Sequence, residues 1–101
     1  MALIIDRAEL LARVRKAVAV MEARDLTVQV TGSLARGDDG PASDVDFLVT
    51  RCPPHWRYRI EGLVEDVMGG KPFDVIYLDE LSPGRAGLMQ RDAKRIEDIA
   101  A

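Results

Sequence analysis

Two carboxylates that stand two positions apart in a short hydrophobic run have the clearest chemical potential in this sequence. Asp44 and Asp46 flank Val45, and the run continues through residues 47–49 as Phe-Leu-Val. Because side chains alternate along a β-strand, both carboxylates fall on one face, about 7 Å apart. Two such groups suit a divalent cation better than they suit each other. The pair therefore predicts a metal site on one face of a strand.

A third carboxylate, Asp74, falls near the start of another apolar run, FDVIYL at residues 73–78. An acid at this position is expensive to bury unless it is paired or bound to a metal. A simple ion pair with Lys71 or with an arginine is the alternative interpretation. Three acids on neighbouring strands are the minimum set for a two-metal site, in which one metal binds a triphosphate and the other activates a hydroxyl.

A Gly-Ser pair, Gly32 and Ser33, precedes the acids, and ten residues separate Ser33 from Asp44. A glycine lets the backbone approach a ligand, and a helix that begins there directs free amide groups at it, so such a turn attracts phosphate. Taken alone, Gly-Ser after a strand is usually only a turn, and an Asp at a strand start is usually a boundary residue. The combined spacing, with strand patterns on both sides, favours a functional site.

Hydrophobic periodicity supplies the elements that must position these residues. Helical spacing predicts a first helix over residues 7–24, opened by a capping-box-like Asp6 and Glu9, and alternation predicts a strand over 26–31. A second strand covers 44–50, a second long helix runs from Trp56 to the Gly69-Gly70 pair, and a third strand covers 73–78. A weaker helical stripe begins at Ser82-Pro83 and extends to the carboxyl end, where the mixed-charge segment 91–98 is expected to be a solvated helix face.

This order of elements predicts an α/β or α+β domain with a small sheet covered by helices. At 101 residues the chain is expected to form a single domain, residues 1–101, so that anything it modifies must dock from outside. Its aromatic share of 5% is low, so aliphatic side chains must fill most of the core.

Composition excludes several classes of function. The formal net charge of −3 offers no broad surface for nucleic acid, although a nucleotide can still bind where metal and backbone meet its phosphates. The lone Cys52 excludes an internal disulfide and a zinc site built on several cysteines. No run approaches the ~20 apolar residues of a membrane span, so we expect a cytoplasmic protein without a membrane partner.

The segment GSLARGDDGPASDVDFLV, residues 32–49, resembles the signature of the polymerase-beta-type nucleotidyltransferases: Gly-Ser, ten residues, then Asp-x-Asp. Within that superfamily, the Ala35-Arg36-Gly37 continuation, Ser43 before Asp44 and the short length most resemble the minimal nucleotidyltransferase (MNT) group. The resemblance covers nearly the whole chain and implies the nucleotidyltransferase fold, a small mixed sheet flanked by helices. Thr31 is a departure, because many members have an aromatic or larger apolar residue before Gly-Ser.

The resemblance also implies roles for individual residues. Gly32 and Ser33 would hold the triphosphate of ATP, the substrate, and Arg36 would lie near the phosphates or brace the acidic loop. Asp44 and Asp46 would bind Mg²⁺, and Asp74 would complete the metal site beside the attacking hydroxyl.

Members of the MNT group are typically antitoxins paired with a HEPN-type ribonuclease toxin. The resemblance therefore implies transfer of AMP from ATP to a tyrosine hydroxyl of a cognate toxin, which is thereby neutralised. Two alternatives stay open at this point. One is an antitoxin that blocks its toxin by contact alone, and the other is an enzyme that modifies a small molecule, although such enzymes usually carry an additional helical domain.

Overall fold

The computed structural model describes residues 6–40 and 43–99 of the chain. Its helices and strands, in chain order, are α1 (Arg7–Glu22), β1 (Thr27–Thr31), α2 (Ser33–Arg36), β2 (Val45–Arg51), α3 (Ile60–Met68), β3 (Phe73–Tyr77) and α4 (Pro83–Asp92). Short 3₁₀ turns cover Pro54–Trp56, Leu78–Glu80 and Ile96–Asp98. This order confirms the predicted α/β architecture.

The sheet has three strands in the order β1-β2-β3. β1 pairs with β2 in antiparallel fashion, and β2 pairs with β3 in parallel, so the sheet is mixed. The register places Thr31 opposite Asp46 and Asp46 opposite Asp74. The last residue of β1 and two of the predicted site acids therefore form a row across the sheet.

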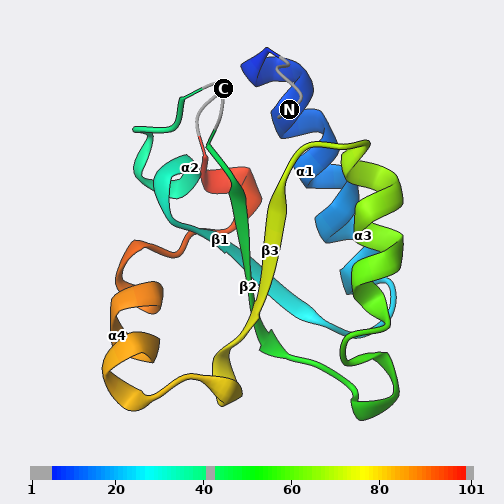
Figure 1. The fold of residues 1–101 in the computed structure, drawn as a ribbon, viewed down its shortest axis with the longest axis vertical. Coiled ribbons are helices and arrows are strands. Elements are labelled where there is room, and N and C mark those ends of the chain that lie inside the picture. Colours follow the sequence, from blue (N-terminus) through cyan, green and yellow to red (C-terminus); the bar gives the residue numbers. More distant parts are fainter. Residues whose placement is uncertain (1–5, 41–42, 100–101) are drawn as a thin grey trace.

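The hydrophobic core lies between one face of this sheet and the helices α1 and α3, which run side by side in Figure 1. The alternating residues Val45, Phe47 and Val49 of β2 are all buried in it, as the period of two predicts. The opposite face of β2 carries Asp46 and Leu48. One face of the central strand thus packs into the core, and on the other face Leu48 is also buried whereas Asp46 stays partly accessible.

α1 forms where its sequence pattern predicts. The Asp6 side chain accepts a hydrogen bond of 2.8 Å from the Glu9 amide, which caps the first turn. The helix buries six residues at helical spacing: Leu10, Leu11, Val14, Ala17, Val18 and Met21. It ends at Glu22, slightly before the predicted Arg24, because Asp25 adopts a left-handed conformation with a φ of 67° and turns the chain into β1.

The second long helix begins later than the sequence predicts. Trp56 belongs to a 3₁₀ turn, and Tyr58 has a positive φ of 67° that no α-helix accommodates. The Tyr58 amide donates instead to the hydroxyl of Tyr77 on β3, at 2.9 Å. α3 then starts at Ile60 and ends, as predicted, at Gly69 in the left-handed conformation.

The prediction of one helix from Ser82 to the carboxyl end is wrong. α4 ends at Asp92, and Ala93 is extended, with a φ of −69° and a ψ of 137°. Lys94 then pairs with Val30 of β1 through two backbone hydrogen bonds of 2.8 Å. The buried Ile96 and Ile99 therefore reach the core from a separate turn beyond α4, and the last two residues lie outside the described part of the chain.

α4 stands apart from the core. It has no buried residue, and Figure 1 shows it on the far side of the molecule from α1 and α3. No helix within the described residues is both long enough and apolar enough to cross a membrane.

Candidate active site

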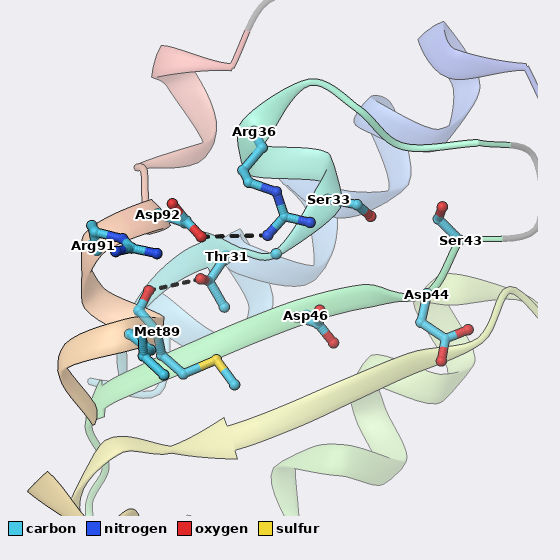
Figure 2. A pocket seen from close by; sticks show the side chains of 11 residues that line it. Thr31, Ser33, Arg36, Ser43, Asp44, Asp46, Met89, Arg91 and Asp92 are labelled. Atoms are coloured by element: carbon cyan, nitrogen blue, oxygen red, sulfur yellow. Dashed lines mark hydrogen bonds and ion pairs between the residues drawn. The ribbon is translucent and has the colours of Figure 1, made fainter. Parts of the chain in front are cut away.

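Asp44 and Asp46 occupy the start of β2, where the strand leaves the loop that follows α2. Asp44 lies immediately before the strand and is exposed, whereas Asp46 lies inside it and is half-buried. Figure 2 shows both side chains at this end of β2, with Ser43 beside Asp44. Strand alternation accounts for their shared face, because Val45 between them points into the core.

Asp74 lies on β3 directly beside Asp46, because the two residues are partners in the parallel register. Adjacent strands are about 4.8 Å apart, so the two carboxylates are near neighbours. The Asp74 side chain is exposed, which removes the burial argument for a special role at this position. What remains is its position, because β3 brings a third carboxylate to the same end of the sheet.

This concentration of negative charge perturbs Asp46. Burial raises the pKa of the Asp46 carboxyl above its ordinary value, and the neighbouring charges of Asp74 and Asp44 raise the pKa further. The positive charge of Arg36 lowers the pKa of Asp46, but its effect is smaller than that of burial or of either neighbouring carboxylate. The carboxylates thus repel one another without a cation between them.

The turn from β1 into α2 depends on Gly32. Its φ of 76° and ψ of −153° lie in a region that is essentially accessible only to glycine. A Cβ at this position would also collide with the carboxylate of Asp46. The bare backbone of Gly32 therefore packs directly against the site, and Ser33 opens α2 beside it.

Arg36 is held by two acidic side chains. Its Nε donates to Asp38 at 3.1 Å, and its Nη1 donates to Asp92 of α4 at 3.3 Å. Both carboxylates raise the pKa of the guanidinium, so Arg36 is a permanent cation beside the acidic site. These contacts connect Arg36 with the residues after α2 and with α4, and both roles implied for Arg36 stay predictions.

These elements surround an open pocket of about 690 Å³. Its lining joins the predicted site residues to part of α4 and comprises Thr31, Gly32, Ser33, Arg36, Ser43, Asp44, Asp46, Leu88, Met89, Arg91 and Asp92. Figure 2 shows α4 facing the acids from the other side of the pocket. Asp74 is not among the lining residues and joins the group only through its pairing with Asp46.

The α4 side of the pocket is the part that sequence reasoning missed. The mixed-charge pattern of residues 91–98 predicts a solvated helix face that includes Asp92. Met89 is only partly buried, and both residues line the pocket. The Ser-Pro start of α4 was the available signal for the helix, but nothing in its pattern indicates which residues face a site on another element.

The donor set fits magnesium better than it fits a metal held by protein alone. Within residues 6–40 and 43–99, no group of three or more histidine, cysteine or acidic side chains is arranged to hold a metal ion by itself. Magnesium is usually bound through one or two carboxylates together with phosphate oxygens of a substrate. The carboxylates around Asp46, next to a glycine turn that lets backbone approach phosphate, match that pattern.

Comparison with known proteins agrees with this architecture. The model of the nucleotidyltransferase domain family matches residues 11–98, so the chain belongs to that family. A solved structure assigned as a minimal nucleotidyltransferase is 26% identical, with a TM-score of 0.74 over 89% of this chain and 95% of that one. The resemblance inferred from the Gly-Ser and Asp-x-Asp block is thus confirmed, together with the fold.

A second solved structure, a crystal structure of a toxin-antitoxin with AMP-PNP, shares the fold at 16% identity. Its TM-score is 0.62, and the alignment covers 85% of this chain and 71% of that one. A search of curated proteins gave no significant match.

Proposed function

We propose that this protein is a nucleotidyltransferase antitoxin that transfers AMP from ATP to a hydroxyl group, in particular a tyrosine hydroxyl, of a HEPN-type ribonuclease toxin. One observation carries the proposal: Gly32, Asp46 and Asp74 lie together at one end of the sheet, beside an open pocket. Membership of the nucleotidyltransferase domain family supports the reaction class. The similarity to a toxin-antitoxin structure supports the choice of partner.

In this proposal the chain mainly binds and orients charged groups. The backbone at Gly32 and the amides that open α2 at Ser33 hold the triphosphate. Asp44 and Asp46 would hold Mg²⁺, and Asp74 would complete that metal site beside the acceptor hydroxyl. Bound magnesium would neutralise the phosphate oxygens and lower the pKa of that hydroxyl. The hydroxyl releases its proton to solvent and its oxygen bonds to the α-phosphorus. The bond from the α-phosphorus to the oxygen that bridges to the β-phosphate breaks, and pyrophosphate leaves.

The exposure of the acids supports a protein as the acceptor. Asp44 and Asp74 are both exposed, and Asp44 lines the open pocket. A hydroxyl on the surface of a second protein can therefore reach this end of the sheet without any opening of the fold. A small acceptor needs a pocket of its own that binds it. Asp74 is not among the residues that line the pocket.

The direct test is co-expression with a HEPN-type ribonuclease toxin, chosen from genes that neighbour the gene of this protein, followed by mass measurement of the recovered toxin. We expect the toxin to gain one or more AMP units of about 329 Da each. Asp74→Asn should fold and fail both to modify the toxin and to protect cells. Asp66→Asn, which removes an exposed acid from α3, is the matched control and should protect like the wild type.

A toxin that is inhibited but unmodified would contradict the proposal. In that case Asp74→Asn would protect as well as the wild type, and the protein would be an antitoxin that acts by contact.

A further inference from the structure

α4 provides one side of the pocket although it buries none of its residues. Leu88, which lines the pocket, is 57% exposed, and the helix contains two glycines, Gly84 and Gly87. Most helices in proteins are stabilised by packing of an apolar face, and glycine lowers the intrinsic stability of a helix further. The position of α4 must therefore depend on other contacts.

One of these contacts comes from Thr31, the last residue of β1. Thr31 is 1% exposed, and its Oγ1 donates to the backbone carbonyl of Met89 at 2.7 Å, as Figure 2 shows. That carbonyl lies in the last turn of α4, where the usual helical donor is the amide of Ala93. The Ala93 amide donates to Gln90 instead, so the Thr31 hydroxyl supplies the donor for Met89.

Two further contacts hold the carboxyl-terminal end of α4 and the residues just after it, one from β1 and one from α2. Lys94 pairs with Val30 just beyond the helix, and Asp92 accepts from Arg36 of α2. The Arg36 pair is half-exposed and therefore weak in water. The Thr31 contact is the one that acts on the helix itself from a buried position.

Thr31 also belongs to the acidic end of the sheet. It is the register partner of Asp46 and directly precedes Gly32. One residue thus connects the turn beside the acids with the helix on the opposite side of the pocket. A hydrophobic residue at this position could fill the same space in the core, but it could not bond to α4.

We propose that Thr31 is a positioning residue, which holds α4 so that Leu88 and Met89 form an apolar wall for the nucleoside part of the substrate. The acids and the Gly32 turn meet the phosphates, and the wall meets the base and sugar. This inference rests on the proposed nucleotide-binding function. Thr31 also lines the pocket, but its hydroxyl is bonded to the Met89 carbonyl, so its effect on the nucleoside would come through α4.

Two substitutions at Thr31 separate its hydroxyl from its volume. Thr31→Val keeps the shape and loses the donor, whereas Thr31→Ser keeps the donor. Thr50→Val is the control, because Thr50 on β2 makes an exposed hydrogen bond to the Thr27 carbonyl, at 3.3 Å, away from the pocket. Each variant is examined by hydrogen exchange of the backbone amides and by titration with Mg²⁺ and α,β-methylene-ATP, an analogue that cannot release pyrophosphate.

In Thr31→Val we expect faster amide exchange confined to residues 83–94 and a roughly tenfold weaker affinity for the analogue, because the partly buried Met89 carbonyl loses its donor. Thr31→Ser should restore both values, and Thr50→Val should leave both unchanged. With a transfer assay in hand, the KM for ATP should rise in Thr31→Val more than kcat falls.

Wild-type protection of α4 in Thr31→Val would overturn the proposal, as would unchanged affinity for the analogue or failure of Thr31→Ser to restore it. Faster exchange that spreads through β1 and α1 would also overturn it, because Thr31 would then be only a core residue. If the wild type binds no analogue, the proposed function fails, and the exchange of α4 still decides whether Thr31 holds the helix.

Discussion

At the scale of single residues, Asp46 is the carboxylate whose charge is least favourable in the metal-free site. It is half-buried, it faces Asp74 across the register, and the bare backbone of Gly32 packs against its carboxylate. The repulsion and the burial both disfavour its charge, which is why the pKa of this carboxyl is raised. A divalent cation would reverse the balance, since the clustered carboxylates then become an attractive site.

Asp46→Asn should therefore stabilise the metal-free protein slightly, by no more than about 1 kcal/mol, because solvent screens much of the repulsion at a half-exposed group. The sign follows from the raised pKa: ionisation of Asp46 opposes folding, so the variant gains most above the pH at which this carboxyl ionises. Urea denaturation at pH 7 without metal measures the change. A loss of 2 kcal/mol or more would show that Asp46 has a structural role instead.

Gly32 and Gly37 offer a paired test of the turn. Both have a positive φ, 76° and 84°, but a Cβ meets the Asp46 carboxylate at Gly32 and nothing within 4 Å at Gly37. Alanine at either position should lower stability by roughly 1–3 kcal/mol through backbone strain. Only Gly32→Ala should also abolish nucleotide binding, as measured by titration with the methylene analogue of ATP.

A Gly37→Ala variant that loses nucleotide binding to the same extent would argue that strain in α2, and not the approach of Gly32 to Asp46, controls the site. Ser33→Ala should weaken binding less than Gly32→Ala, because the backbone amide at residue 33 remains.

Residue types and spacing were enough to predict the acid pair and the glycine turn, because both depend on local strand alternation and on a short connection. They were not enough to predict Met89 or Asp92 as pocket residues. Those two reach the pocket through long-range contacts, from Thr31 to Met89 and from Arg36 to Asp92, which span 58 and 56 residues of sequence. No local pattern encodes such a pairing.

At the scale of elements, the strands followed their sequence patterns closely, and the helix ends did not. Tyr58 delays α3 through a left-handed backbone and a hydrogen bond from its amide to Tyr77. Beyond the end of α4, the backbone of Lys94 pairs with Val30, so the chain cannot continue as a helix there. In both cases a tertiary contact overrides helical periodicity. The local sequence around the boundary therefore does not predict where the helix begins or ends.

Two glycines, one in α3 and one in α4, test whether each helix is stabilised by the core or by local contacts. A Cβ at Gly62 of α3 or at Gly87 of α4 meets nothing within 4 Å, so alanine fits at both positions. Each substitution should favour its helix by up to about 1 kcal/mol. Because α3 contributes to the core, Gly62→Ala should raise the global melting temperature, whereas Gly87→Ala should mainly slow amide exchange within α4.

An increase in melting temperature for Gly87→Ala as large as for Gly62→Ala would contradict this distinction. It would mean that α4 unfolds together with the core and is not a locally supported element.

At the scale of the whole molecule, helical and strand periodicity predicted the layers of the fold. The core forms from α1, α3 and one face of the sheet, as the apolar positions of those elements require. The net charge of −3 leaves nucleotide binding to local groups, and the pocket brings Arg36 and the α2 turn next to the acids. The acceptor and the partner remain proposals, because they depend on a surface of another protein.

The central claim is that the carboxylates around Asp46 and the Gly32 turn form one magnesium-dependent nucleotide site. Calorimetric titration with α,β-methylene-ATP tests it most directly, in Mg²⁺ and in EDTA, for the wild type, Asp46→Asn and the control Asp66→Asn. We predict binding that requires Mg²⁺, weakens at least about tenfold in Asp46→Asn and is unchanged in Asp66→Asn. Equal affinity with and without Mg²⁺, or equal affinity in Asp46→Asn and the wild type, would contradict the account.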